Sequence, residues 1–343
     1  LLKVRIGNIT KTNMIEKGIS TLLVGKQYEQ AIREYFSDVK FDLIMYSTPP
    51  ITLAGVVKHI KKRNGARTYL LLKDIFPQNA VDIGIMSTTG VKGLLYKHFR
   101  KQEKKLYAIS DRIGCMSQAN VDYVIKHNPE GDPKIVEVCP NSIEVCDKSV
   151  DEETRKEIRK KYGIPLGKKV FVYGGNLGKP QGIDFMIECL KSQEYNDRVF
   201  FIIIGNGTEY KKIESHIKQS KQTNVKLMNR LPKEDYMRMV GSCDVGLLFL
   251  DHRFTIPNFP SRLLSYMEGK MPVLAATDSN TDVGAVIEEG KFGYWCESNN
   301  AERFVAMMNR FSDESRRHEM GENAYQFLIA HFDVARTYQI IIP

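Results

Sequence analysis

The stretch that begins at residue 259 reads Phe259-Pro-Ser-Arg-Leu-Leu-Ser-Tyr-Met-Glu-Gly-Lys-Met-Pro-Val-Leu-Ala275, and it predicts a short helix followed at once by a buried strand. Pro260-Ser261 favours a helix start, whereas Gly269 and Pro272 end the helix before an apolar run. The start of a helix carries unpaired N–H groups and partial positive charge, to which Arg262 adds a full charge. The stretch therefore suits an anion such as a diphosphate, although helix–glycine–strand units also occur in α/β proteins without such a site.

Short apolar runs alternate with helical patterns along most of the chain, which is typical of an α/β fold with parallel sheets. A mostly charged segment, Glu144–Gly167, separates two such series, so we predict two α/β units in tandem. The predicted strands cover residues 41–46, 66–72, 112–116, 134–143, 170–173, 199–204, 225–228, 244–250 and 273–276. The predicted helices cover residues 20–36, 51–62, a segment ending at 107, 119–126, 183–190, 301–311 and 324–341.

Polar and glycine-rich segments follow several predicted strands. Lys73-Asp74 comes after a strand of the first unit. In the second unit, the turn Gly174–Gly182 carries Lys179, and Gly205-Asn-Gly207 and Arg230 follow the next two strands. The carboxyl ends of parallel strands share one edge of a sheet, where open α/β sheets bind ligands, and glycines let backbone N–H groups approach an anion. We therefore predict a nucleotide or sugar-phosphate site at this edge of the second unit.

Positive charge is concentrated in the first half of the chain. Residues 1–150 hold 23 basic and 15 acidic side chains, so they carry nearly all of the formal net charge of +9. The densest run, Lys97–Lys105, alternates cations with aromatic and apolar residues at helical spacing, which suits an anionic membrane surface or phosphates. A solvated helix face is the alternative. No recognised nucleic-acid motif accompanies the charge, so we expect no nucleic-acid partner.

Several classes of protein are disfavoured by what the sequence lacks. No apolar run approaches the roughly 18 residues that a membrane span needs. The six cysteines form no C-x-x-C pair, which favours a reduced, cytoplasmic protein, and without H-E-x-x-H or D-x-D motifs we expect no metal and no cofactor. The first residue is Leu and no charged-then-apolar leader follows, so we expect no signal peptide and a natural start that lies upstream.

Four segments together resemble a known enzyme family. In chain order they are Val138-Cys-Pro-Asn-Ser-Ile143, Tyr173-Gly-Gly-Asn-Leu-Gly178, Ile203-Ile-Gly-Asn-Gly207 and Phe259–Ala275. They are similar to the retaining glycosyltransferases of family 4, which implies the GT-B fold, two facing Rossmann-like lobes with parallel sheets. More narrowly, Tyr69–Val81 and Phe259–Ser265 look like the bacterial O-antigen and capsule transferases that add N-acetyl-L-fucosamine or related deoxy-aminosugars.

The resemblance implies a domain layout. Residues 1–147 correspond to an acceptor-binding lobe, residues 148–325 to a lobe that binds the nucleotide sugar, and residues 326–343 to a helix that crosses back toward the first lobe. Members of the family normally begin with a further strand and glycine-rich loop. By strand count this chain begins about sixty residues into the usual first lobe, so we expect that lobe to be incomplete at its start.

The resemblance also implies site residues. Asp74 and Lys73 fall on the acceptor side as candidate catalytic residues, with a strand-end cap or an internal salt bridge as the alternative role for Asp74. Arg230 falls near the nucleotide, or else is a surface residue before a turn. The expected donor-binding residues are Gly175, Asn176, Lys179, Gly205, Asn206, Arg230, Asn258, Ser261, Arg262, Leu263, Leu264 and Ser265.

Two glutamates that family members usually carry, eight positions apart, are absent from this chain. Pro257 and Ser265 stand in their places. Ser265 retains a hydroxyl for the ribose, and Asn258, Asp251 or Glu268 offers other polar contacts.

The residues that grip the diphosphate in many relatives are also replaced. Asn176 and Gln181 stand where those relatives have Arg and Lys, so we expect Lys179 and Arg262 to neutralise the leaving group. A His that often precedes the first-lobe Asp is Lys73 in this chain.

The expected function is therefore transfer of a sugar, with retention, from a UDP-sugar to a polyprenyl-diphosphate-linked saccharide. Such an enzyme would work in the cytoplasm, with the Lys97–Lys105 helix placed to dock at the inner face of the bacterial plasma membrane. In this family the leaving phosphate itself is thought to take the acceptor proton, so no strong side-chain base is needed. A non-catalytic partner subunit of the same fold and a sugar-nucleotide 2-epimerase are the alternatives.

Overall fold

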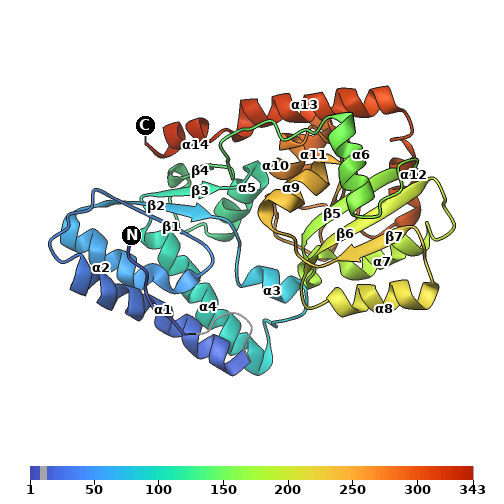
Figure 1. Ribbon diagram of the computed structural model, residues 1–343. Coiled ribbons are helices and arrows are strands. Elements are labelled where there is room, and N and C mark those ends of the chain that lie inside the picture. The colour runs from blue at the N-terminus through green and yellow to red at the C-terminus, as the bar shows by residue number, and fades with distance from the viewer. Residues whose placement is uncertain (8–13, 343) are drawn as a thin grey trace. The chain divides into compact units, whose positions relative to one another are not determined.

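The computed structural model describes the backbone of residues 1–7 and 14–342, and the side chains of residues 1–7, 20 and 23–342. The chain separates into two compact units, Leu1–Pro140 and Asn141–Pro343 (Figure 1). This division lies seven residues before the one expected after residue 147. The helix expected to cross between lobes belongs to the second unit, and its crossing stays a prediction.

The first unit is built on a four-stranded parallel sheet in the order β1-β2-β3-β4. Its strands are β1 Leu43–Ser47, β2 Arg67–Leu72, β3 Arg112–Cys115 and β4 Val136–Val138. Its helices are α1 Met14–Tyr35, η1 Ile51–Leu53, α2 Ala54–Asn64, α3 Gln78–Asp82, α4 Gly90–Ile109, α5 Gln118–His127 and η2 Pro133–Ile135. Helix α2 packs against both α1 and α4, and α5 packs against β4.

The second unit is built on a six-stranded parallel sheet in the order β10-β9-β8-β5-β6-β7. Its strands are β5 Lys169–Asn176, β6 Val199–Asn206, β7 Val225–Met228, β8 Val245–Phe249, β9 Val273–Thr277 and β10 Gly293–Glu297. Its helices are α6 Glu152–Lys161, η3 Lys179–Gln181, α7 Ile183–Lys191, α8 Tyr210–Ser220, α9 Lys233–Gly241, α10 Arg262–Glu268, α11 Val283–Glu289, α12 Ala301–Asn309, α13 Glu314–Phe332 and α14 Val334–Ile341.

Strand β5 shows why this sheet forms a double-sided core. Phe171 and Tyr173 pack in one buried cluster, with α7 and α12, whereas Val170 and Val172 pack in the other, with α10 and α13. All four side chains are fully buried. A strand covered by helices on both faces reads as a continuous apolar run, as residues 170–173 do. The prediction of two parallel α/β units is thus confirmed.

Helix α6 lies in the charged segment that the sequence marked only as a boundary. Its sequence, EETRKEIRKK, has one aliphatic residue, Ile158, and its other buried side chain is Arg159. Asp151 caps the helix by accepting from the Thr154 N–H at 2.7 Å. Hydrophobic periodicity cannot detect a helix whose buried face includes an arginine.

The carboxyl-terminal helix differs from the expected continuous segment 324–341. Asp333 interrupts it, and the Asp333 side chain caps α14 by accepting from the Ala335 N–H at 2.8 Å. At the same junction, Ile143 donates to the Phe332 carbonyl and accepts from the Val334 N–H, each at 3.0 Å. The junction of α13 and α14 is therefore tied to the beginning of the second unit.

Candidate functional site

The strand order of the second sheet reverses between β5 and β8. From β5 the chain proceeds to β6 and β7 on one side, then returns to β8, β9 and β10 on the other. The two central strands pair only at Phe171–Val245 and Val172–Gly246, so they diverge toward their carboxyl ends. A crevice of this kind is where open α/β sheets bind ligands. Both the glycine turn after β5 and the segment that leads from β8 to α10 begin there.

The last residues of β5, where the predicted glycine turn begins, approach α10 closely. Gly175 has φ +141°, and a Cβ at this position would lie 3.1 Å from the Arg262 Cζ. Gly175 is therefore required both by its backbone conformation and by the guanidinium beside it. The turn is held by Gln181, whose Oε1 accepts from the Gly178 N–H at 3.3 Å and from the Asn176 Nδ2 at 3.1 Å. Gln181 and Asn176 thus stabilise the turn through their side chains.

The Arg262 guanidinium is enclosed by tyrosines. Its Cζ lies 4.4 Å from the centre of the Tyr173 ring, in a cation–π contact. Burial alone would lower the pKa of Arg262, but interactions with Tyr173, Tyr266 and Tyr236 outweigh burial and raise it, so the side chain is a cation at neutral pH. Burial raises the pKa of Tyr236 to about 12, so its hydroxyl stays neutral.

Two buried nitrogen atoms of this segment have no hydrogen-bond partner among the described residues. They are Arg262 Nη1 and Asn258 Nδ2. The two residues are four apart in sequence, and both belong to the segment between β8 and α10. Since buried donors are almost always satisfied in folded proteins, these two donors, close together in sequence, are candidates for binding an acceptor.

Tyr266, one turn after Arg262, spans the gap between the diverging strands. Its hydroxyl lies 3.2 Å from the Val172 carbonyl oxygen of β5 and 3.0 Å from the Leu247 carbonyl oxygen of β8. The Gly174 N–H donates to the same hydroxyl at 3.3 Å. The tyrosine therefore fixes the spacing of the two strands beneath the glycine turn.

The remaining residues expected to bind the donor take different positions. Lys179 and Arg230 are exposed, and neither forms an ion pair with another described residue. Gly205 and Asn206 end β6 beside the glycine turn, in register with Gly175 and Asn176. Arg230 follows β7, two strands from β5, which corresponds to about 10 Å across the sheet.

The expected residues on α10 are not equivalent. The side chains of Leu263 and Leu264 are 0% and 4% exposed and belong to the core, and their backbone N–H groups donate to the Pro260 and Ser261 carbonyls at 3.1 and 3.2 Å. Ser261 precedes the helix without a side-chain capping bond. Ser265 is partly exposed in the middle of the helix.

Two carboxylates considered as replacements for the family's glutamates are already paired. Asp251 binds Arg253 Nε and Nη2 at 2.8 and 2.7 Å. Glu268, buried at the end of α10, binds Lys148 Nζ through both oxygens at 2.6 and 2.7 Å. Their charges are therefore neutralised within the protein.

In the first unit, Lys73-Asp74 follows β2 as expected. Thr48, which follows the adjacent β1, accepts from the Lys73 and Asp74 N–H groups at 3.1 and 3.3 Å. Burial raises the pKa of Asp74 to about 6, against the opposing effect of the hydrogen bonds that the carboxylate accepts from Asn79 Nδ2, at 2.8 Å, and from the Ile75 backbone. Asp74 therefore changes charge near neutral pH, whereas the Lys73 side chain is exposed.

The polar residues that support the site were not singled out in the sequence. Tyr173, Tyr236 and Tyr266 surround Arg262, and Thr48 and Asn79 hold Lys73-Asp74. Tyr173 and Tyr266 occur within segments that the sequence marked, but a tyrosine in an apolar pattern is indistinguishable from an ordinary core residue. Only its hydroxyl partners reveal its role.

Comparison with known proteins identifies the family. The sequence pattern that defines the family Glycosyl transferases group 1 matches residues 154–327, slightly more than half of the chain. The chain belongs to this family. Two curated relatives of this group 1 glycosyl transferase are WbjE of Pseudomonas aeruginosa, named as a probable glycosyltransferase, and TuaC of Bacillus subtilis, named for teichuronic acid biosynthesis.

These relatives are longer than the chain. WbjE is 24% identical to this chain over an alignment that covers 76% of this chain and 63% of WbjE. TuaC is 22% identical over an alignment that covers 71% of this chain and 58% of TuaC. The group 1 glycosyl transferase described here thus matches less than two thirds of each of these curated relatives.

Solved structures share the fold of this group 1 glycosyl transferase. The sucrose-phosphate synthase of Thermosynechococcus elongatus has a TM-score of 0.77 at 12% identity, over 99% of this chain and 81% of its own. HepE of Anabaena, solved with UDP-glucose, has a TM-score of 0.71 at 18% identity, and the alignment covers 92% of this chain and 80% of HepE. The prediction of the GT-B fold, with a parallel sheet in each lobe, is confirmed.

Two expectations from the sequence, that no segment spans a membrane and that no metal is bound, concern the described residues as a whole. Among them, no helix is both long and apolar enough to cross a lipid bilayer. No group of three or more His, Cys, Asp or Glu side chains within the described part is arranged to hold a metal ion. The expectation of catalysis without a metal stays a prediction.

Proposed function

We propose that this protein is a retaining glycosyltransferase. Its donor is a UDP-sugar, and we propose that the transferred sugar is a deoxy N-acetylhexosamine. Its acceptor is a hydroxyl of a polyprenyl-diphosphate-linked saccharide. It would act in O-antigen or capsule polysaccharide synthesis in the bacterial cytoplasm.

The observation that carries the proposal is the pair of buried, unsatisfied donors at Arg262 and Asn258. A buried donor without a partner costs about 1–3 kcal/mol, and more when it is charged. That cost is recovered when a phosphate oxygen replaces the lost water. Gly175 leaves the space for such an oxygen because it has no side chain, and Arg262 supplies a fixed positive charge against the departing diphosphate.

The relatives support the class of substrate. HepE was solved with UDP and with UDP-glucose, and it shares the fold over nearly the whole chain. TuaC is named for teichuronic acid biosynthesis and a further relative, WcaI of Escherichia coli, for colanic acid biosynthesis. Both names concern bacterial surface polysaccharides, which are assembled from nucleotide sugars.

In the proposed reaction the protein mainly stabilises charge. Arg262 and Lys179 bind the diphosphate that leaves the anomeric carbon, Asn258 binds the sugar or its phosphate, and Arg230 lies toward the nucleotide. Asp74 and Lys73 line the acceptor side. With a pKa of about 6, Asp74 can accept a hydrogen bond from the acceptor hydroxyl and exchange a proton with it, which supplements proton transfer to the leaving phosphate.

Calorimetric titration with UDP, in the presence of EDTA, tests the central claim. Arg262→Met removes the charge but keeps the length of the side chain, and Arg262→Lys keeps the charge but loses Nη1. We expect Arg262→Met to weaken UDP binding by about 1–3 kcal/mol and Arg262→Lys by less. Lys211→Gln, an exposed change on α8, is the control. Equal UDP affinity in all four proteins would refute the site, provided that the emission of Trp295 shows that each variant is folded.

Turnover distinguishes the proposal from its alternatives. A non-catalytic partner subunit would bind UDP-sugar but release no UDP with any lipid-linked acceptor. A 2-epimerase would interconvert the nucleotide sugar without any acceptor. Transfer that depends on the acceptor, with the anomeric configuration retained by NMR, is the result expected of the proposed enzyme.

We also propose that α4 docks on an anionic lipid surface. The sequence suggested the whole run Lys97–Lys105 for this role, but two of its cations are paired within the unit. Arg100 pairs with Glu103 and donates to the His127 carbonyl at 2.8 Å, and Lys104 pairs with Glu130 at 2.6 Å, so both are engaged within the unit.

Three other lysines of α4, Lys97, Lys101 and Lys105, are exposed and form no ion pair with any described residue. In the first turns of the same helix, just before Lys97, Val91, Leu94 and Leu95 are 85%, 69% and 48% exposed. An exposed apolar segment beside unpaired lysines suits insertion at an anionic membrane surface.

Sedimentation with vesicles that contain phosphatidylglycerol tests this surface. We expect Leu94→Ser and Lys101→Glu each to reduce binding several-fold, whereas Lys104→Glu should have a smaller effect because its charge is already paired. Binding that is unchanged in the first two variants would exclude α4 as the dock.

A further inference from the structure

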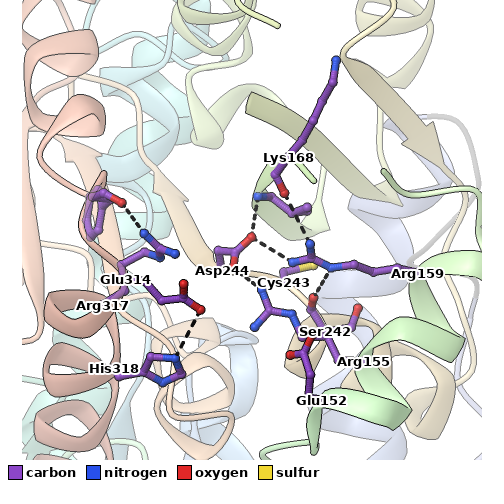
Figure 2. Close-up of polar contacts among 12 residues, drawn as sticks. Glu152, Arg155, Arg159, Lys168, Ser242, Cys243, Asp244, Glu314, Arg317 and His318 are labelled. Atoms are coloured by element: carbon purple, nitrogen blue, oxygen red, sulfur yellow. Dashed lines mark hydrogen bonds and ion pairs between the residues drawn. The ribbon is translucent and has the colours of Figure 1, made fainter. Parts of the chain in front are cut away.

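A second hollow lies at the opposite edge of the second sheet, where the strands begin. It has a volume of about 390 Å³. Figure 2 shows its centre, with Asp244 between Arg155 and Arg159. It is lined by α6, by the segments that precede β5, β6 and β8, and by the start of α13.

The centre of this hollow is a structural ion-pair cluster. Asp244 binds Arg155 and Arg159, the latter at 2.8 Å, and accepts from the Val170 N–H at 2.7 Å. Arg159, only 3% exposed, also donates to the Ser242 carbonyl at 2.8 Å. Although burial raises the pKa of Asp244, the two arginines outweigh burial and lower it. This carboxylate is therefore ionised and has no capacity left for further cations.

Three more cations line the hollow without a carboxylate partner among the described residues. They are Lys169, Arg198 and Arg317. Arg317 donates to the Phe311 and Ser312 carbonyls, at 2.8 and 3.1 Å, so its position is fixed by the backbone rather than by an acid. The Lys168 side chain points away from the centre of the cluster (Figure 2).

The acidic residues at the rim do not balance these charges. Glu152 lies 3.6 Å from Lys156. Glu314 lies 3.8 Å from His318 (Figure 2). The excess of positive charge affects Lys169. Burial is the main cause that lowers its pKa, and the nearby Arg317 and Arg198 lower it further. Asp244 raises the pKa of Lys169, but the other effects together are larger. Like charges held together in a hollow favour the binding of an anion, and the exposed carboxylate of Glu314 at the rim opposes it without cancelling the three cations.

We propose that this hollow binds a small multivalent phosphate, such as inorganic diphosphate or the phosphates of a phosphorylated metabolite, through Lys169, Arg198 and Arg317. Two guanidinium groups and one ammonium group provide both the charge and the planar donors that phosphate oxygens accept. The volume of about 390 Å³ admits a ligand larger than a single phosphate ion.

This site is separate from the proposed donor site. Lys169 begins β5 and Asn176 ends it, so seven residue steps of about 3.3 Å, roughly 23 Å, lie between the two edges of the sheet. The inference therefore does not depend on the proposed glycosyltransferase activity.

The experiment is calorimetric titration of the whole chain with pyrophosphate at 0.15 M ionic strength. We expect Lys169→Gln and Arg198→Gln each to weaken binding severalfold and the double variant to weaken it at least tenfold. Glu314→Gln, which removes a rim carboxylate, should strengthen binding. Lys211→Gln is the matched control, because this lysine is exposed on α8 away from the hollow. Repeating the titration in the Arg262→Met background separates this site from the donor site.

Each outcome has a clear consequence. Pyrophosphate binding that survives Arg262→Met but is lost in the double variant supports the proposal, even if UDP proves not to bind. Binding that Arg262→Met abolishes, or that the double variant retains, overturns it. It is also overturned if sodium chloride of equal ionic strength stabilises the second unit, measured by Trp295 fluorescence, as much as pyrophosphate does. Without anion, Lys169→Gln should be more thermally stable than the natural chain, because it relieves repulsion.

Discussion

Replacing Asp74 with Asn should stabilise the protein at neutral and alkaline pH but much less at acid pH. Asp74 has a folded-state pKa of about 6 against an ordinary value of 3.8. Because the folded pKa is the higher one, the neutral carboxyl fits the fold better than the carboxylate. The stability it contributes is complete below pH 3.8 and is lost as the pH rises through 6. Asn keeps a similar shape and never ionises.

The size of the effect follows from the shift. A difference of about 2 pKa units corresponds to about 3 kcal/mol of unfolding free energy once both states are ionised. This is an upper limit, because the Asp74 side chain is partly exposed. At pH 5 roughly half of the penalty is already present, so the advantage of the Asn variant should grow by about 1–2 kcal/mol between pH 5 and pH 8.

Two measurements together check this prediction. Urea unfolding followed by far-UV circular dichroism gives the difference in stability between the two proteins at each pH. A carbon-13 NMR titration of labelled aspartates should show a carboxyl with a midpoint near pH 6 that disappears in Asp74→Asn. Trp295 is the only tryptophan and lies in the second unit, so its emission checks that the substitution leaves that unit intact.

The reasoning would be refuted by a stability difference that stays constant from pH 5 to pH 8, or by a variant that is less stable at pH 8. Either result would mean that the hydrogen bonds from Asn79 and Ile75 favour the carboxylate at least as much as burial disfavours it.

Three further predictions concern the second unit, and urea unfolding followed by Trp295 fluorescence measures the first two. Tyr266→Phe should cost about 1–3 kcal/mol, because it leaves the Gly174 N–H and a strand carbonyl without their partner. A loss below 0.5 kcal/mol would show that the hydroxyl is dispensable. Asp244→Asn should cost about 3–5 kcal/mol at pH 7 by leaving two arginines unneutralised. The cost should decrease as the pH falls from the ordinary pKa of 3.8 through the lower folded pKa, because the stability that the carboxylate contributes is complete only above the ordinary pKa. A pH-independent cost would contradict this. Glu268→Gln should leave UDP affinity unchanged in calorimetry, since this carboxylate binds Lys148. A loss of UDP affinity as large as that expected for Arg262→Met would show that Glu268 does contribute to donor binding.

Much of the fold was predictable because strands covered on both faces are continuous apolar runs. Residues 170–173 and 199–204 are such runs, and they fall in the observed β5 and β6. Strand β10 was not predicted, since Gly293-Tyr-Trp-Cys-Glu297 is neither a continuous apolar run nor a clean alternation. Helix α6 was missed because Arg159 occupies a core position that is made tolerable by partners distant in sequence, Asp244 and the Ser242 carbonyl.

For the site, the sequence indicated which segments reach the strand ends but not which side chains remain available there. Asn258 and Glu268 looked equally suited as polar contacts on the donor segment. The structure separates them, because Lys148, 120 residues earlier, neutralises Glu268, whereas Asn258 Nδ2 has no partner among the described residues. Such pairings depend on contacts between distant parts of the chain, which local patterns do not contain.

Helix α10 is attached to its surroundings at both ends and in the middle. Its first residue is enclosed by tyrosines, Tyr266 joins it to two strands, and Glu268 joins it to Lys148. A seven-residue helix held in this way cannot rotate or slide without breaking buried polar contacts. Motions that accompany ligand binding should therefore carry α10 together with the sheet as one rigid body, while the exposed loops of Lys179 and Arg230 adapt around the ligand. If the proposed donor site binds as we infer, its affinity for the diphosphate would be set when the protein folds, and its selectivity among sugars would be set by loops that can change without disrupting the sheet.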